Sequence, residues 1–194
     1  MNHPTPHSIR GLVYASLLGA ATAAGAYIIV PLPPVPITLQ TLFMALAAAL
    51  LGARLGALSQ VVYVLLGLIG LPVFAGGKAG FGVLLGPTGG YLVGFVAGAY
   101  VTGFLVDRMH HPGALRIALA VAVGYLVVYV PGVIQLSLVA KISMLEAFSL
   151  GALPFLIGDA LKTAAIAIVV PKVRDRIQPV GLTGKAVSGK RMQA

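Results

Sequence analysis

Six apolar runs follow one another along the chain, and most are about as long as a membrane is thick. They lie at residues 11–30, 37–52, 55–71, 87–106, 114–140 and 148–171. A helix needs roughly 20 apolar residues to cross a bilayer, and within the hydrocarbon layer only helices and closed barrels satisfy their backbone hydrogen bonds. The runs predict an all-α integral membrane protein with six transmembrane helices. The short second and third spans form either a tight hairpin or a pair that stops short of the full bilayer thickness.

The composition agrees with a membrane location. Of the 194 residues, 59% are hydrophobic and 9% are charged, and the mean hydropathy is +1.01, whereas an average soluble domain has about 25% charged residues. The net charge of +9 would suit nucleic acid only if the basic residues covered a folded soluble surface. Here they lie at the ends of apolar runs, so no nucleic-acid partner is expected. The chain has no cysteine, which excludes disulfides and thiolate metal sites.

The basic residues also predict the orientation, because lysine and arginine are enriched in cytoplasmic segments next to spans. Six spans place both termini on one side. Ten basic residues fall on that side, namely Arg10, Arg54, Arg108, Arg116, Lys172, Arg174, Arg176, Lys185, Lys190 and Arg191, and two fall opposite, Lys78 and Lys141. We expect a protein of the cytoplasmic membrane with both termini in the cytoplasm. One membrane domain covers residues 1–173, and residues 174–194 form a loose basic tail.

Asp159 and Lys162 lie inside the last apolar run. They share one helix face because they are three positions apart. An ionisable group at membrane depth costs about 2.5 kcal/mol or more, so it usually faces a partner, a cavity or a substrate. Either the two residues form a self-neutralising structural pair, or they form a binding site. In a site the carboxylate accepts ligand N–H groups, and the ammonium binds a ligand oxygen.

The loop over residues 71–91 is rich in glycine and carries Phe74, Phe81 and Tyr91. Glycine permits tight turns and close approach of the backbone. The loop is predicted to face outward. It is either a lid whose aromatic side chains cover an apolar ligand or a loop at the membrane interface.

Residues 31–36 hold four prolines and are predicted to be extended rather than helical. Thr38 and Gln40 follow at the mouth of the second span, where they either bind a ligand or satisfy the local backbone. Gln135 follows Pro131 in the fifth span, and interhelical hydrogen bonding is its expected role.

The first span carries two neighbouring stripes of small residues. One consists of Ala15, Gly19 and Ala23, and the other of Ser16, Ala20 and Ala24. Small side chains let two helices approach closely. The stripes serve either internal packing or the docking of a separate membrane partner.

Signatures of an enzyme are missing from the sequence. It has neither HExxH nor G-x-S-x-G, and no GK pair completes a P-loop, so the chain cannot hydrolyse ATP alone. The four histidines have no carboxylate or cysteine companions, and neither a metal nor a cofactor is predicted. An independent secondary transporter of another small polar solute would also explain the buried pair. Inverted repeats would favour that alternative, and none is evident between the two halves.

Four motifs, taken together and in order, resemble the BioY family, the biotin-specific S components of energy-coupling factor (ECF) transporters. They are Val35-Pro-Ile-Thr-Leu-Gln40, Gly70-Leu-Pro-Val-Phe-Ala-Gly-Gly77, Gly86-Pro-Thr-Gly-Gly-Tyr91 with Gly94-Phe95, and Pro154-Phe-Leu-x-Gly-Asp-x-x-Lys162. The resemblance covers nearly the whole chain except the tail. The outward loops are predicted at residues 31–36, 72–86 and 141–147. The resemblance implies a six-helix S-component bundle that captures biotin from outside, with the first and third of these loops closing over the ligand.

The resemblance also implies partners and site residues. Family members associate with a transmembrane coupling (T) protein and with ABC-type ATPases, which supply the missing P-loop. The residues that resemble the coupling motif are Ala15, Gly19, Ala20, Ala23 and Ala24. For biotin itself, Asp159 suits the ring N–H groups, Lys162 the ring carbonyl, and Phe74, Phe81 and Tyr91 the apolar body. The candidate donors for the biotin carboxylate are Lys78, the backbone N–H groups of Gly76 and Gly77, and Lys162 itself.

Overall fold

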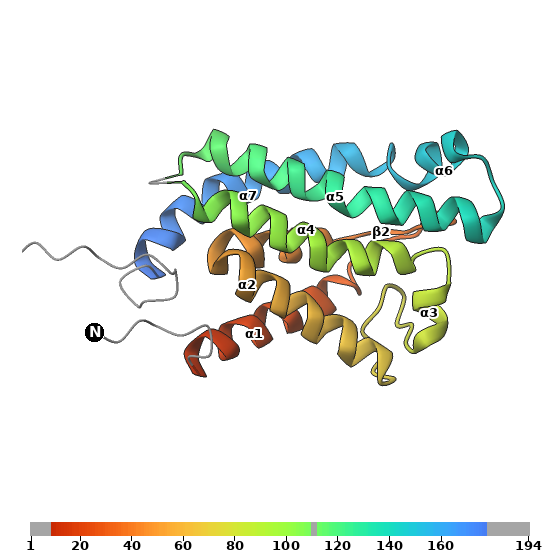
Figure 1. Ribbon diagram of the computed structural model, residues 1–194, viewed down its shortest axis with the longest axis horizontal. Helices are drawn as coiled ribbons and strands as arrows, with labels where there is room; N and C mark the ends of the chain where they lie inside the picture. Colours follow the sequence, from red (N-terminus) through yellow and green to blue (C-terminus); the bar gives the residue numbers. More distant parts are fainter. Residues whose placement is uncertain (1–8, 110–111, 178–194) are drawn as a thin grey trace, which may run out of the picture.

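Helices make up nearly all of the regular structure in the computed structural model, which describes residues 9–109 and 112–177 (Figure 1). The elements are α1 (Ile9–Gly25), β1 (Ile29–Val30), β2 (Ile37–Thr38), α2 (Gln40–Leu68), α3 (Phe81–Leu85), α4 (Gly89–Asp107), α5 (Ala114–Ala140), α6 (Met144–Gly151) and α7 (Phe155–Ile177). In Figure 1 the start of α1 and the end of α7 lie at the same end of the bundle. This is the arrangement expected for an even number of crossings.

The helix α2 is broken at Gly52, where φ is 81° and ψ is −177°. Glycine reaches this φ without the steric cost that a side chain would add. The amide of Gln40 donates to the hydroxyl of Tyr63, whereas in a continuous helix these residues would lie about 34 Å apart. The two halves of α2 therefore fold back on each other as antiparallel legs. The predicted tight hairpin between the second and third spans is confirmed, with its turn at a single residue.

With α2 counted as two legs and α6 with α7 as one, the described residues contain six legs, and the predicted all-α membrane bundle is confirmed. In this part of the chain α4 and α5 are each long and apolar enough to cross a membrane, and α2 is so only when its two legs are taken together over 29 residues. The helices α6 and α7 form a further candidate span that is bent by 47° at the break between them. The last span was predicted as residues 148–171. This prediction lacked the bend, and it began four residues after the actual start of α6 at Met144.

The first span ends earlier than predicted because the chain turns into a small hairpin. Ile29 pairs with Thr38 and Val30 with Ile37, in antiparallel register. The prolines of residues 31–36 fall in the connection, where the missing proline N–H breaks no ladder bond. The segment predicted to be extended is thus the non-helical connection of a two-stranded hairpin, whose second strand leads directly into α2.

The helix α4 lies between α2 and α5 (Figure 1). Its face toward α5 has a stripe of glycines that includes Gly94 and Gly98. A β-carbon at either position would lie 2.7 Å from a backbone oxygen of α5, that of Val128 or of Gly124. The lack of side chains allows α4 and α5 to pack backbone to backbone.

Arg174 ties three segments together at the end of the bundle where the chain termini lie. Its guanidinium donates to the carbonyl of Ala49 at 2.9 Å and lies 3.2 Å from the carboxylate of Asp107. The other oxygen of Asp107 accepts the N–H of Ala53 at 2.9 Å. Only 4% of Arg174 is exposed, and α7 continues to Ile177. The prediction that a loose tail begins at 174 is therefore wrong for its first residues, and residues 178–194 lie outside the described part.

Candidate functional site

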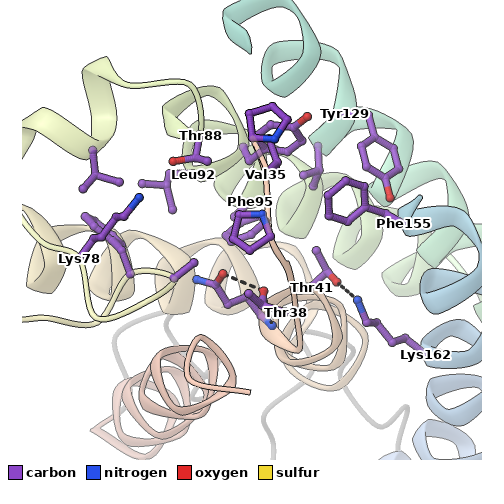
Figure 2. A pocket seen from close by; sticks show the side chains of 18 residues that line it. Val35, Thr38, Thr41, Lys78, Thr88, Leu92, Phe95, Tyr129, Phe155 and Lys162 are labelled. Atoms are coloured by element: carbon purple, nitrogen blue, oxygen red, sulfur yellow. Dashed lines mark hydrogen bonds between the residues drawn. The ribbon is translucent and has the colours of Figure 1, made fainter. Parts of the chain in front are cut away.

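A pocket lies between the β-hairpin connection, the start of α2, the segment before α3, and helices α4, α5 and α7 (Figure 2). Its volume is about 90 Å³. The wall is mostly apolar and aromatic, with two ammonium groups and several hydroxyl or amide groups. The lining residues are Pro34, Val35, Pro36, Thr38, Gln40, Thr41, Phe74, Ala75, Lys78, Val83, Thr88, Tyr91, Leu92, Phe95, Val128, Tyr129, Phe155 and Lys162.

Lys162 reaches the pocket from α7 and meets the first turn of α2. Its ammonium donates to the hydroxyl of Thr41 at 2.8 Å and to the carboxylate of Asp159 at 3.0 Å. The side chain is only 8% exposed, so a compensating charge is needed beside it. The one-turn spacing on α7 places that carboxylate next to the ammonium.

Asp159 lies behind Lys162, outside the set of pocket-lining residues. One carboxylate oxygen accepts from Lys162 and from the hydroxyl of Thr41, at 3.0 and 3.3 Å. The other accepts from the hydroxyl of Tyr129 on α5. The same carboxylate lines a second cavity of about 550 Å³ between α5 and α7. In this arrangement Lys162, rather than Asp159, faces the pocket.

Thr38 and Gln40 lie side by side in the wall, and both are buried. The Thr38 hydroxyl donates to Gln40 Oε1 at 2.8 Å, and Gln40 Nε2 donates to the Tyr63 hydroxyl. The Gln40 N–H also contacts the Thr38 hydroxyl at 3.3 Å. Ligand binding and local hydrogen bonding were the two alternatives for these residues, and the structure is compatible with both. Thr38 and Gln40 hold the hairpin of α2 together, and they also line the pocket.

Phe74 and Lys78 lie in a tight turn in the segment between α2 and α3. The Phe74 N–H donates to the Lys78 carbonyl, and the Gly77 N–H donates to the Phe74 carbonyl, both at 3.0 Å. Gly76 and Gly77 have φ of 73° and 72°, where glycine is strongly favoured. The Gly77 N–H is thus used within the turn. Phe74 is fully buried, with an edge-to-face contact to Tyr63, while Lys78 is exposed at the mouth of the pocket.

The structure brings together six of the eight residues predicted to bind substrate. These are Thr38, Gln40, Phe74, Lys78, Tyr91 and Lys162. Asp159 lies in the layer behind them. Phe81 does not reach the pocket, since it begins α3 and is 65% exposed. Tyr91 lines the wall with its ring, while its hydroxyl donates to the Gly151 carbonyl at 2.8 Å.

Several wall residues were not predicted. Thr88 and Phe155 lie inside the quoted motifs, and Thr41 directly follows one, so the motifs held a signal for all three. Tyr129 had none, because a single tyrosine in an apolar run is common in membrane helices. The first and second of the three segments predicted to face outward supply the mouth of the pocket. The third, residues 141–147, contributes no lining residue within the described chain, so the pocket does not show the closure by the third loop that the resemblance implies.

Gln135 holds the C-terminal end of α3 against α5. Its side-chain amide donates to the carbonyls of Leu84 and Gly86, at 2.7 and 2.8 Å. This is the interhelical hydrogen bonding predicted for it. The contact places α3 beside the pocket without placing Gln135 in its wall.

The two small-residue stripes of α1 have different surroundings. Ala15 and Gly19 are buried, and a β-carbon on Gly19 would lie 2.7 Å from the Ser59 carbonyl of α2. Ser16, Ala20 and Ala24 are exposed on the neighbouring face, and Ala23 is half-buried between the two. The first stripe therefore packs inside the chain, and the second is open to a partner.

A model of the BioY family matches residues 1–179. The biotin transporter BioY of Thermotoga maritima is 41% identical over 166 residues, which cover 86% of this chain and 96% of that protein. The biotin transporter BioY of Rhizobium etli is 37% identical over 173 residues, covering 84% and 91%. The crystal structure of the S-component for biotin from an ECF-type ABC transporter aligns with a TM-score of 0.80 at 29% identity, covering 86% of this chain and 92% of that one.

Proposed function

Because the chain belongs to the BioY family, we propose that it captures biotin in the pocket described above, as the S component of an ECF-type ABC transporter. One observation carries the assignment of the pocket. Figure 2 shows Lys78 at one side of the cavity and Lys162 at the other, with Val35, Leu92 and Phe95 between them. Two cationic donors separated by an apolar wall suit a ligand with an acceptor at each end and an apolar body.

Biotin has this distribution of groups. Its ring carbonyl meets the Lys162 ammonium, and its carboxylate lies at the mouth beside Lys78, where both charges stay partly hydrated and their pairing costs little desolvation. The thioether ring and the aliphatic chain pack against Phe74, Tyr91 and Phe95. The oxygens of Gln40 and Thr41 are acceptors for the ring N–H groups. Direct acceptance by Asp159 requires Thr41 or Lys162 to move aside first.

The pocket must open to admit a ligand of this size. Its volume of about 90 Å³ is well below the roughly 300–1,000 Å³ of typical ligand sites. Segments 34–36 and 74–78 cover it from the outer end. Gly70 and Gly80 flank the second segment with φ of 107° and 86°, and a β-carbon at either would meet no atom within 4 Å. These glycines are the hinges around which the segment swings, so that it works as a lid.

Transport requires a partner that hydrolyses ATP, because the chain has no P-loop and no enzymatic activity of its own is proposed. The exposed stripe Ser16–Ala20–Ala24 is the face against which a transmembrane coupling protein packs, since small residues admit a close helix–helix contact. The ABC-type ATPases bind that coupling protein. We propose that the end of the bundle that holds the termini faces the cytoplasm, because most basic residues lie at this end, and that the pocket faces the outside.

The direct test is calorimetric titration of biotin into the detergent-solubilised full chain, with Lys162→Met measured in parallel. We expect stoichiometric binding by the wild type and a loss of at least about tenfold in the variant. Lys172→Met is the control, because that lysine is exposed and lies outside the pocket. A folded wild type that does not bind biotin contradicts the proposal and favours an independent secondary transporter of another solute.

A further inference from the structure

We infer that Tyr129 is a positioning residue for ligand capture, which holds the Asp159 carboxylate and thereby keeps the Lys162 ammonium directed into the pocket. This inference rests on the proposed function of the pocket. Tyr129 comes from α5, Asp159 and Lys162 come from α7, and the Tyr129 hydroxyl donates to Asp159 Oδ2. In Figure 2 Tyr129 and Lys162 lie on the same side of the pocket, beside Phe155.

Most N–H groups of the Lys162 ammonium already donate to acceptors in the protein. An ammonium has three N–H groups, and two of them are used by Asp159 Oδ1 and Thr41 Oγ1. The third has no protein acceptor among residues 9–109 and 112–177. Since Lys162 lines the pocket, this N–H is the one available to a ligand oxygen. The site therefore selects a ligand with an acceptor at this end, provided that the other two contacts stay in place.

The contacts of Asp159 depend on Tyr129. Its Oδ1 is shared by Lys162 and Thr41, and within the described chain Tyr129 is the donor to Oδ2. The carboxylate also lines the cavity between α5 and α7, whose wall is largely alanine and leucine. Without the Tyr129 hydroxyl, Oδ2 would lie against this apolar wall with no described donor. The carboxylate would then turn both oxygens toward Lys162 and draw the ammonium away from the ligand.

Tyr125 provides a matched control, because it lies one turn before Tyr129 on the same helix. Its hydroxyl donates to the backbone carbonyl of Thr41 at 3.3 Å, and within the described residues it makes no hydrogen bond to Asp159. It lines the cavity between α5 and α7, but not the ligand pocket. Both tyrosines lose only a hydroxyl when they are changed to phenylalanine. The two variants therefore separate the loss of a buried hydroxyl from the loss of the Asp159 contact.

The experiment measures the affinity of the full chain for biotin and for 2-thiobiotin, whose sulfur is a weaker acceptor than the carbonyl oxygen it replaces. Wild type, Tyr129→Phe and Tyr125→Phe are compared by calorimetry, with thermal unfolding as the check on folding. Tyr129→Phe is expected to bind biotin about tenfold more weakly or worse and to lose most of the preference for biotin over 2-thiobiotin. Tyr125→Phe is expected to keep that preference.

A second comparison tests whether the two residues act as a unit. In an Asp159→Asn background, Tyr129→Phe is expected to cause less than about a twofold further loss, because coupled residues are not additive. Equal effects of Tyr129→Phe on both ligands, or full additivity with Asp159→Asn, would overturn the positioning role while leaving biotin capture intact. Absence of biotin binding by the folded wild type would instead overturn the proposed function, and this inference with it.

Discussion

The ammonium of Lys162 donates to the hydroxyl of Thr41 at 2.8 Å, although the two residues are 121 positions apart in the chain. This contact joins the N-terminal half of α7 to the first turn of α2. About 12 residues further along α7, the Arg174 guanidinium contacts the Ala49 carbonyl near the other end of the same α2 leg. The last helix is thus held to this leg by polar contacts at both ends, in a bundle whose other contacts are mainly apolar.

Lys78 is predicted to recognise the carboxylate of the ligand. Lys78→Asn should weaken biotin binding by about three- to tenfold, because an exposed charge contact contributes only about 1 kcal/mol. The effect should be much smaller for biotinamide, which has no negative charge. Affinities for both ligands at low and high salt check this. The control is Lys141→Asn, which changes the other outward lysine at a position with φ of 55°, where asparagine is well tolerated.

If Lys78→Asn weakened the binding of biotin and biotinamide equally, the carboxylate would have another partner. A parallel loss in Lys141→Asn would point to a general electrostatic effect on ligand approach.

The two stripes of α1 are predicted to respond differently to larger side chains. Ala20→Leu, on the exposed stripe, should leave biotin binding unchanged and abolish co-purification with the coupling protein. Ala15→Leu, at a position that is 1% exposed, should lower the free energy of unfolding by about 1–3 kcal/mol through overpacking against α2. Val13→Leu, at another exposed site on α1, is the control for helix bulk. Intact assembly and transport by Ala20→Leu would exclude this stripe as the coupling face.

The Asp107–Arg174 contact is predicted to stabilise the fold without serving the ligand. Asp107→Asn should lower the free energy of unfolding by about 1–3 kcal/mol, because it leaves a buried guanidinium without its counter-ion, while half-exposure of Asp107 reduces the effect. The double variant with Arg174→Gln should be less destabilised than the sum of the single changes. Thermal unfolding in detergent measures both, with exposed Arg116→Gln as the control. A large loss of biotin affinity in these variants would show that this end of the bundle is coupled to the pocket.

The lid is predicted to depend on its glycine hinges. Gly80→Ala places a side chain at φ 86° in open space, so it strains the backbone without creating a clash. We expect a slower association rate for biotin, because the backbone strain hinders the exchange of segment 74–78 between its open and closed positions. Gly82→Ala, which also meets no atom within 4 Å but has no positive φ, is the matched control. Stopped-flow association kinetics distinguish them, and equal rates would argue against a hinge at Gly80.

Much of the fold was predictable because it depends on local chemistry. Apolar runs of sufficient length must form helices in a bilayer, whatever packs around them, so the six helical legs followed from hydropathy. The exact bounds did not follow, because they depend on contacts between distant segments. Residues 29–30 leave the helix to pair with 37–38, and the 47° bend before α7 lies beside Gly151, whose carbonyl accepts from the Tyr91 hydroxyl of α4.

The site was predictable to the extent that its residues lie in motifs. The spacing of Asp159 and Lys162 placed both on one helix face, and the resemblance to the BioY family, which the family match confirms, directed attention to Thr38, Gln40, Phe74, Lys78 and Tyr91. Phe81 belongs to the same loop as Phe74 and was predicted to bind the ligand on the same grounds, yet its side chain is exposed and does not line the pocket. Which aromatic residue of a glycine-rich loop points inward depends on the turns that the loop adopts.

The sequence by itself determined that this is a helical membrane protein with six legs, its ligand through the family motifs, and that the ionisable pair shares one helix face. These properties depend on composition, on spacing within one helix and on motif order. Only the tertiary structure decided that Lys162 faces the pocket while Asp159 lies behind it, that Tyr129 reaches that carboxylate, and that Arg174 is buried rather than part of a tail. Each of these depends on hydrogen bonds and ion pairs between helices that are far apart in the chain, and no local pattern in the sequence encodes them.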